Sequence, residues 1–375
     1  MINRDRLVET FLALCRINSP ARSEGGVADW LQANLEAIGL TCVRDDTSQV
    51  TGSETGNLIA TLPANVRDAD PIFFAAHMDT VEPNPGVKIV VDGDIIKTDG
   101  TTILGADDRA GIAPIVEALR VIVERDLPHG PIEAVFTVCE EIGLLGAKAL
   151  DIRRLGARYG YVLDSTPPVG GVVVSAPSQD SFRVTIKGRP AHAGAEPEKG
   201  ISAIEVAAAA ISKMRLGRID HETTANVGVI QGGEATNIVC PEVVMLAEAR
   251  SRNSEKLAAQ VEHMVQTWKS AAADRGAEVC VDIEHQYEAY RIDEADPVLQ
   301  RALSAARQVG LPPTTKVVGG GSDANVFNAK GLPTCVLGTA MSGVHTHEER
   351  VAVSDLYASA EWTVAVAIEG VKKSV

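Results

Sequence analysis

The chain has 375 residues, of which 45% are hydrophobic and 23% are charged, and its formal net charge at pH 7 is −15. This length exceeds the size at which a single hydrophobic core stops growing, so we expect two domains. The acidic balance argues against a nucleic-acid-binding protein, which would present a basic face, and weakly against a protein that binds anionic membranes.

The N-terminal stretch MINRDRLVETFLALCRI (residues 1–17) predicts a short amphipathic helix with charges inside it rather than a signal peptide. No apolar run approaches the length that spans a membrane. The six cysteines are far apart and form no CxxC pair, a pattern that suits a reducing compartment. We therefore expect a cytoplasmic protein.

Helical and extended patterns alternate through the first part of the chain. Helices are predicted at about 4–16 and 24–39, before the extended runs TCVRDD, NLIATLP and PIFFAAHMDT. A hairpin, VKIVVDGDIIKT, has Asp92-Gly93 as its turn signal. The helical segment DDRAGIAPIVEALRVIVERD and the strands EAVFTVCEE and YGYVLDS follow. Such alternation predicts a mostly parallel sheet covered on both faces by helices.

The pattern changes near residue 178 to the order β-α-β-β-α-β, which is the ferredoxin-like arrangement. After about residue 292 the first pattern returns, with TTKVVGGGSDANVFN, the strand PTCVLGTA and a final helix from about 354. We therefore predict an α/β protein in which a discontinuous domain of residues 1–177 and 292–375 carries an inserted ferredoxin-like α+β domain of residues 178–291.

Acids and histidines follow the predicted strands at their ends. The strand EAVFTVCEE runs from apolar residues directly into Glu140 and Glu141, and burying an unpaired carboxylate costs several kcal/mol. Ligands of open α/β sheets gather at the carboxyl ends of the strands, so these side chains are expected to meet something positive. The other candidates at such ends are His77, Asp79, Asp107, Asp108, Asp164, His345 and His347.

The residue types in this cluster indicate the metal. Imidazole and carboxylate without thiolate suit zinc, with manganese or cobalt as substitutes, rather than calcium or magnesium. The ligands are too many for one tetrahedral ion but enough for two ions that share a carboxylate. Two-metal hydrolases hold their ions about 3.5–4 Å apart and activate a water between them. One of Glu140 and Glu141 is then expected to bind metal, and the other to act as a free general base.

The motifs HMDT, GADDRAG, CEEIGLLGA, VLDS and VHTHEE together resemble the di-zinc exopeptidases of the aminoacylase/carboxypeptidase family, and most closely its peptidase T-like (tripeptide aminopeptidase-like) branch. The resemblance covers essentially the whole chain. It implies a catalytic di-zinc domain with an inserted lid and dimerisation domain. It also implies a zinc-dependent exopeptidase that hydrolyses short peptides and removes N-terminal residues from tripeptides.

The resemblance also assigns roles to the clustered residues. Glu140 becomes the general base, and Asp79 orients His77 by accepting its ring N–H. Two Zn²⁺ ions per subunit are implied, with Mn²⁺ or Co²⁺ as substitutes. The metal ligands that it implies are His77 and Asp164 for one zinc, Glu141 and His345 for the other, and Asp107 as the bridge.

Two of these assignments are choices between neighbours. Asp107 is preferred to Asp108 because the bridging acid of the family stands two residues before a basic residue, here Arg109 where the family usually has Lys. His345 is preferred to His347 because it stands four residues before Glu349. The resemblance further implies a cis peptide bond between Asp107 and Asp108.

Residues of the inserted domain and of the glycine-rich segment are expected to complete the site. His192, in KGRPAHAG, would reach the active site of the partner subunit in a homodimer formed through the lid and stabilise the oxyanion. Arg250 and Asn237 would contact the carboxylate or carbonyl of the substrate, since an Arg fork suits a carboxylate. Backbone N–H groups left open at Gly320, Gly321 and Ser322 would line the substrate pocket.

Two other functions remain open. One is an N-acyl-amino-acid or amide deacylase on the same scaffold, because such enzymes share the metal motifs and differ in pocket residues. The other is a catalytically silent metal-binding or peptide-binding protein. The presence of Glu140 argues against the silent protein, because loss of the base is the usual route to inactivity.

Overall fold

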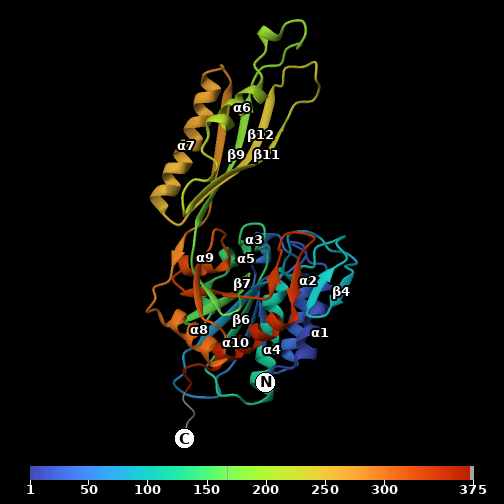
Figure 1. Cartoon of the computed structure of the whole chain (residues 1–375), viewed down its shortest axis with the longest axis vertical. Helices are drawn as coiled ribbons and strands as arrows, with labels where there is room; N and C mark the ends of the chain where they lie inside the picture. The colour runs from blue at the N-terminus through green and yellow to red at the C-terminus, as the bar shows by residue number, and fades with distance from the viewer. Residues whose placement is uncertain (167, 372–375) are drawn as a thin grey trace. The chain divides into compact units, whose positions relative to one another are not determined.

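The computed structural model describes residues 1–166 and 168–371, which form two compact units (Figure 1). The second unit, here called the small unit, consists of one long segment and one short segment of the chain. The large unit holds Met1–Val174, Arg291–Val317 and the described residues from Ser322 onward, and the small unit holds Ser175–Tyr290 and Val318–Gly321. The sequence had placed this last short segment in the discontinuous domain instead.

The large unit contains the main sheet and most of the helices. Its helices are α1 (Arg4–Cys15), α2 (Gly25–Glu36), α3 (Ser48–Thr51), α4 (Ala106–Glu124), α5 (Leu145–Ala149), η1 (Ile152–Arg154), α8 (Pro297–Gln308), α9 (Asp323–Ala329) and α10 (Val353–Ile368). Its strands are β1 (Thr41–Arg44), β2 (Leu58–Leu62), β3 (Ile72–His77), β4 (Ile89–Asp92), β5 (Ile95–Thr98), β6 (Ile132–Thr137), β7 (Tyr159–Ser165), β8 (Gly171–Ala176), β14 (Tyr290–Arg291), β15 (Thr314–Val317), β16 (Thr334–Gly338), β17 (Met341–Ser342) and β18 (Arg350–Ala352).

The main sheet has the strand order β1-β2-β6-β3-β7-β16-β8-β14, with β15 paired to β8. Its centre, β6-β3-β7-β16, is parallel, whereas β1, β2 and β8 pair antiparallel. Every residue of β3 and β6 is buried, so both faces of these strands are covered. The predicted mostly parallel sheet covered by helices is confirmed.

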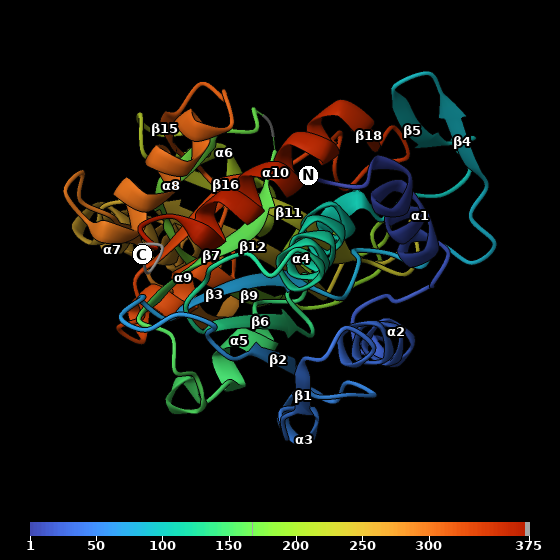
Figure 2. The ribbon, with the colours of Figure 1, turned by 90° about the horizontal axis from the view of Figure 1, so that it is seen from below.

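Helices pack on the sheet in two groups. The long helix α4, buried along most of its length, packs against β3 and β7 and beside α1 and α10 (Figure 2). The short helix α9 packs against β7, β16 and α5. Side-chain caps fix where helices begin: Asn3 accepts the N–H of Arg6 before α1, and Asp296 accepts the N–H of Val298 before α8. Within the described residues, no helix combines the length and the apolar character that crossing a membrane requires.

The small sheet of the large unit, in the order β17-β18-β5-β4, extends the predicted hairpin. Asp92 pairs with Ile95, so the turn is the two-residue loop Gly93–Asp94, with Gly93 at φ +60°. This conformation favours glycine, so Gly93 is a turn residue as predicted, but the loop lies one residue later than the Asp92-Gly93 pair. Asp94 also accepts a hydrogen bond from the N–H of Ser354 at the start of α10, and so ties the hairpin to that helix.

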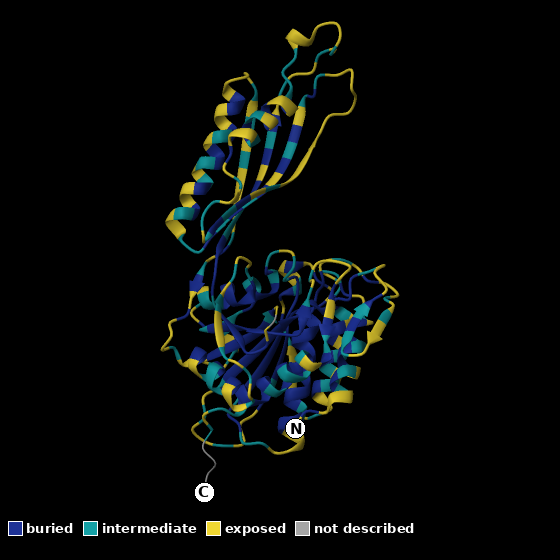
Figure 3. Cartoon of the chain, viewed as in Figure 1, coloured by how far each residue is buried: buried dark blue, intermediate teal, exposed yellow. Residues whose placement is uncertain are grey.

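The small unit is an antiparallel sheet with helices on one face. The sheet order is β10-β11-β12-β9-β13, which is the ferredoxin-like order that the sequence predicted. Buried residues from the sheet and the helices, among them Phe182, Met245 and Trp268, form its core, and Figure 3 shows buried positions recurring along α7. Its elements are β9 (Ser178–Lys187), η2 (Pro197–Lys199), α6 (Ala203–Lys213), β10 (Gly217–Arg218), β11 (Thr223–Gly232), β12 (Glu242–Ser251), α7 (Ser254–Ala273) and β13 (Glu278–Tyr287).

One strand of the small unit is shorter than the sequence suggests. The extended run TNIVCPEVVMLAEARS predicted a strand from about residue 236, but β12 begins at Glu242. Pro241 comes directly before it, and proline has no N–H to donate to a neighbouring strand. The sheet pairing therefore starts just after the proline.

Candidate metal centre

The candidate ligands meet at the carboxyl ends of the parallel strands. His77 is the last residue of β3, Asp164 lies at the end of β7, and Glu140 and Glu141 follow β6. At these strand ends, three groups of described residues have possible ligand atoms within 4.8 Å of one another: His77 with Asp107 and Asp164, His77 with Glu140 and Glu141, and Asp107 with Glu141 and His345. These groups overlap, so they form one cluster.

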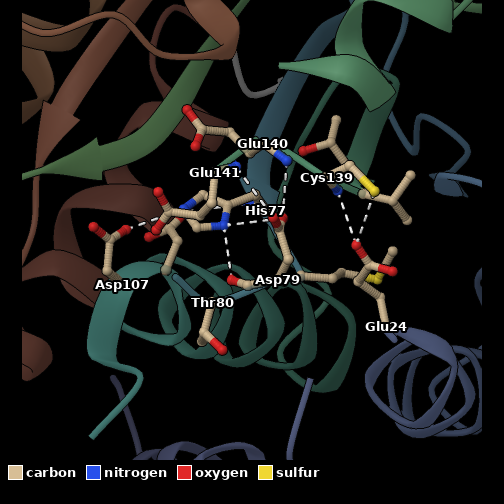
Figure 4. A network of polar contacts seen from close by, with 12 residues as sticks. Glu24, His77, Asp79, Thr80, Asp107, Cys139, Glu140 and Glu141 are labelled. Carbon is tan, nitrogen blue, oxygen red and sulfur yellow. Dashed lines mark hydrogen bonds and ion pairs between the residues drawn. The ribbon is translucent and has the colours of Figure 1, made fainter. Parts of the chain in front are cut away.

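The carboxylate of Asp107 lies between the two imidazoles of the cluster. Its Oδ1 lies 3.0 Å from Nε2 of His77, and its Oδ2 lies 3.2 Å from Nε2 of His345. The same Nε2 of His345 lies 3.2 Å from Oε1 of Glu141. In Figure 4 the side chains of His77, Asp107 and Glu141 point toward one another. One oxygen of Asp107 thus serves each half of the cluster.

Asp108 and His347, the alternatives to Asp107 and His345, do not point into the cluster. The side chain of Asp108 is fully buried, and its Oδ2 accepts the main-chain N–H of His77 at 3.3 Å. The ring of His347 lies 2.9 Å from Glu82, outside the cluster. The Asp107–Asp108 peptide bond is cis, which confirms the prediction.

Asp79 contacts the cluster differently from what the sequence suggested. Nδ1 of His77 lies 3.0 Å from the main-chain oxygen of Asp79 but 3.5 Å from its carboxylate. The carboxylate instead accepts the main-chain N–H of Glu140 at 3.0 Å and of Glu141 at 3.1 Å (Figure 4). Because two peptide N–H groups converge on it, the fully buried acid is satisfied without the ring. Asp79 therefore orients His77 mainly through its backbone and the two glutamates through its side chain.

Both histidines of the cluster occupy positions that favour positive charge. Burial disfavours the charged ring of His77, but its contacts with the carboxylates of Asp107 and, at the longer distance of 3.5 Å, Asp79 outweigh burial and raise its pKa well above the usual value. Hydrogen bonds to Asp107 and Glu141 raise the pKa of His345 to about 10, against the effect of burial. A site that stabilises positive charge at two adjacent points has the electrostatics that a pair of cations requires.

The acids of the cluster are crowded, with Asp107 buried and Glu140, Glu141 and Asp164 half-buried. Burial would raise the pKa of Asp107, but the two imidazoles outweigh it and hold its pKa below the usual range. Burial raises the pKa of Asp164 well above the usual value, and the charge of Asp107 adds to this. Burial also raises the pKa of Glu140 well above its usual value. Divalent cations would favour the ionised form of these acids, so the donor set fits metal ions.

Comparison with known families identifies the chain. The model of peptidase family M20/M25/M40 matches residues 73–369, a range that contains all the candidate metal ligands and the whole small unit. The chain belongs to peptidase family M20/M25/M40. It is therefore a hydrolase of the metallopeptidase class.

Relatives of this M20/M25/M40 chain match it over nearly its whole length. The uncharacterised protein YqjE of Bacillus subtilis (strain 168) is 48% identical over 372 residues, which cover 99% of this chain and 100% of that protein. The crystal structure of aminopeptidase PepT from Bacillus cereus has 46% identity and a TM-score of 0.89, with 98% of this chain and 99% of that chain covered. A tripeptidase structure from Staphylococcus aureus has 40% identity and a TM-score of 0.93, with 98% of each chain covered.

Two candidates of the small unit lie on paired loops of the M20/M25/M40 fold. His192 and Asn237 are exposed, and the N–H of Ala193 donates to the main-chain oxygen of Asn237 at 2.9 Å. Nδ1 of His192 accepts the N–H groups of Gly194 and Ala195, both at 3.1 Å. Since Nδ1 accepts, the proton of a neutral ring lies on Nε2, so His192 presents an N–H donor.

Arg250 of the small unit already has an acidic partner. Its guanidinium makes two hydrogen bonds to Glu248, at 3.0 and 2.9 Å, and its Nη1 lies 3.5 Å from the hydroxyl of Tyr287. Gly320 is exposed, and a Cβ there would lie 4.0 Å from Nη1 of Arg250. A Cβ on Gly321 would lie 2.3 Å from the Tyr287 ring, so only glycine fits beside that ring.

The backbone N–H of Ser322 corrects one prediction. This group was expected to be open toward the substrate pocket, but it donates to Oδ1 of Asn325 at 3.1 Å. Ser322 is the residue at which α9 begins, and a helix start satisfies its free N–H groups with nearby side chains. Ser322 is therefore part of a helix cap.

Two acids near the cluster were missed at the sequence level. Glu349 accepts the N–H groups of Gly105 and Asp107, at 2.7 and 3.0 Å, and so holds the segment that carries the central carboxylate. Asp323 accepts the hydroxyl of Thr137 at 2.5 Å, and burial raises its pKa to about 6. Both stand beside quoted motifs, in VHTHEE and GGGSDAN, and this proximity was the only available signal.

Proposed function

We propose that this protein is a zinc-dependent exopeptidase that removes N-terminal residues from short peptides, with tripeptides as its main substrates. The observation that carries the proposal is the Asp107 carboxylate, whose two oxygens face one imidazole each, with Glu140 beside them. The likeness to PepT from Bacillus cereus and to a tripeptidase from Staphylococcus aureus, at 46% and 40% identity, supports the choice of substrate.

The proposed ligands form two sets that share one acid. Imidazole and carboxylate donors without a thiolate favour zinc, and manganese or cobalt can replace it. When bound, the ions would polarise the peptide carbonyl and lower the pKa of an attacking water. His77 and Asp164 would hold one ion, Glu141 and His345 the other, and Asp107 both.

Glu140 is the proposed general base. It lies beside His77 and Glu141, and its burial raises the pKa of its carboxyl group, which suits a group that must take and return a proton. Glu140 takes one proton from the water whose oxygen attacks the peptide carbonyl. It then delivers that proton to the amine nitrogen as the C–N bond breaks. The products are a free N-terminal residue and a shortened peptide.

The small unit is proposed to act as a lid and as the contact surface of a homodimer. The Nε2–H of His192 would stabilise the oxyanion in the active site of the partner subunit, and the tautomer set by its backbone contacts supplies that donor. Asn237 and Arg250 would contact the peptide. We also propose a cytoplasmic location. The six cysteines are free thiols, which suits a reducing compartment.

A substrate panel tests the function. Purified protein would be treated with a chelator, reloaded with Zn²⁺, Mn²⁺ or Co²⁺, and assayed with dipeptides, tripeptides, and N-acylated forms of the same tripeptides. We expect no turnover after chelation, recovery with metal, and a higher kcat/KM for free tripeptides than for the N-acylated forms. Preferred release of the acyl group would identify a deacylase instead. Failure of every substrate with metal bound would indicate a silent binding protein.

A further inference from the structure

The turn between β6 and Glu140 contains a residue with left-handed backbone. Cys139 has φ +53°, a region that residues with a side chain rarely adopt and keep only where their surroundings impose it. Cys139 directly precedes Glu140, so its backbone angles set the direction in which Glu140 leaves the strand. The groups that hold Cys139 therefore bear on the position of Glu140.

Three successive amides of this turn donate to two buried carboxylates. The N–H groups of Glu140 and Glu141 donate to Asp79, as described above. The N–H of Cys139 donates to Oε1 of Glu24 at 2.9 Å, and its Sγ lies 3.3 Å from the same oxygen (Figure 4). Asp79 follows β3, whereas Glu24 stands directly before α2, so the turn is held from two sides.

Glu24 is itself anchored on the side away from the turn. Its side chain is fully buried, Oε1 also accepts the N–H of Arg22 at 2.9 Å, and Oε2 accepts the hydroxyl of Ser53. Among the contacts of the described residues, the partners of this carboxylate are neutral donors, so an ion pair does not explain why an acid is buried here. A buried carboxylate that accepts several hydrogen bonds is instead a fixed point from which a loop can be held.

We propose that Glu24 is a positioning residue for the general base. By accepting the Cys139 N–H, it fixes the turn that directs the Glu140 carboxylate into the metal centre. The inference rests on the base role proposed for Glu140. The hydrogen bond from Glu24 to this turn reaches the main-chain N–H of Cys139 rather than the Glu140 side chain, so Glu24 acts through the turn.

Three variants of the full-length, metal-loaded protein separate this role from a simple tether. Glu24→Ala removes the acceptor of the Cys139 N–H, and we expect kcat to fall about 10²-fold, the effect of a misplacement of about 1 Å, with KM and metal content unchanged. Glu24→Gln keeps an oxygen for that N–H and can donate to Ser53, so its kcat should stay near that of the wild type. Ser53→Ala removes only the contact on the far side, and its kcat should also be retained.

A double-mutant cycle with Glu140→Gln decides whether Glu24 acts through the base. If it does, adding Glu24→Ala to Glu140→Gln lowers kcat no further. If Glu24→Ala lowers kcat in the Glu140→Gln background as much as it does in the wild type, the inference is overturned while the base role stands. Full activity of Glu140→Gln overturns the base role and the inference with it. A kcat loss in Ser53→Ala as large as that in Glu24→Ala also overturns the inference, because Glu24 would then only tether α2.

A further variant, Glu24→Asp, covers the case in which Glu24→Ala does not fold. Glu24→Asp keeps the charge but withdraws the carboxylate by one methylene group, so the Cys139 N–H loses its acceptor geometry. We expect a lower kcat than in Glu24→Gln, with an unfolding midpoint close to that of the wild type. A kcat of Glu24→Asp equal to that of the wild type overturns the inference.

Discussion

The candidate residues of the large unit and those of the small unit are held in different ways. In the large unit, His77 is 2% exposed; its Nε2 contacts Asp107 on another element, and its Nδ1 contacts the main-chain oxygen of Asp79 two residues further along. In the small unit, His192 is exposed and its ring contacts the backbone two and three residues further along. The first histidine is fixed by the fold around it, whereas the second is fixed only by its own loop.

This difference indicates how each region contributes to function. A mostly buried cluster with long-range hydrogen bonds exists in complete form within one unit, and such preorganised sites suit metal binding and proton transfer. Exposed side chains on local loops have their function only when another surface meets them. We therefore expect variants of the large unit to change chemistry and metal content, and variants of the small unit to change interactions with the substrate or partner.

Separate replacement of Glu140 and Glu141 by glutamine is the strongest test of the roles assigned in the large unit. Glu140→Gln should keep its metal and lose activity about 10²–10⁴-fold, because a positioned general base is removed. Glu141→Gln, the matched control, should lose metal as well, since its carboxylate lies 3.2 Å from His345 within the cluster. Activity assays and elemental analysis of both proteins make the comparison. Equal metal loss in the two variants would show that the roles were assigned incorrectly.

Replacement of the exposed His192 by alanine tests the role assigned to the small unit. His192→Ala should lower kcat about 10²–10³-fold, the usual effect of losing one oxyanion donor, with metal content unchanged. His221→Ala, an exposed histidine of the same unit, should leave kcat unaltered.

Mixing subunits shows which chain the histidine serves. His192→Ala mixed with Glu140→Ala should regain activity, because a hybrid dimer has one site with both residues intact only if His192 acts across the dimer. Light-scattering and subunit-exchange measurements would accompany the assay. If subunits exchange and no activity returns, His192 serves its own chain or has no catalytic role.

Arg250 should affect substrate affinity more than chemistry. Arg250→Ala should raise KM for free tripeptides about 10–100-fold. This change corresponds to the loss of about 1.5–3 kcal/mol, which is typical of hydrogen bonds to a charged group. Tripeptide amides should show little change, because they lack the carboxylate. Arg252→Ala is the matched control, since Arg252 donates to main-chain oxygens of Val318 and His221. An equal rise in KM for peptide and amide would exclude carboxylate binding by Arg250.

The smallest effect on activity is expected at Arg109, which holds the framework beneath the metal centre. Its buried guanidinium donates to three main-chain oxygens and to the hydroxyl of Ser19. Arg109→Lys should lower the free energy of unfolding by about 1–3 kcal/mol, because an ammonium group cannot reach all these acceptors. The exposed Arg125→Lys should not change it. Urea unfolding compares the two, and an unaltered stability of Arg109→Lys would show that the guanidinium geometry is dispensable.

The sequence predicted the sheet and the ligand cluster because both leave periodic or positional signals. Buried strands that end in acid or histidine place His77, Glu141 and Asp164 at one sheet edge, whatever the loops do. The choice of Asp107 over Asp108 needed the family motif, since both stand at the same helix start. The order of elements in the small unit was likewise sufficient to predict its sheet.

The acids that hold backbone N–H groups could not be predicted in the same way. Glu24 and Glu349 stand in loops, and their partners lie more than a hundred residues away in the chain. No spacing rule connects such pairs, because the contact depends on how loops cross in the folded unit. The same reason explains why the carboxylate of Asp79 was assigned to the ring of His77 rather than to the two glutamates.

The strand order of the main sheet also governs how the protein can fold as it is synthesised. β16 lies between β7 and β8, although about 160 residues of chain separate it from them and the small unit is made in between. A nascent chain therefore has an unfilled gap in its main sheet until the ribosome has released residues 334–338, and His345 follows later still. The small unit, whose sheet comes from one continuous stretch, can complete its pairing earlier. Metal can thus be captured by the full ligand set only near the end of translation.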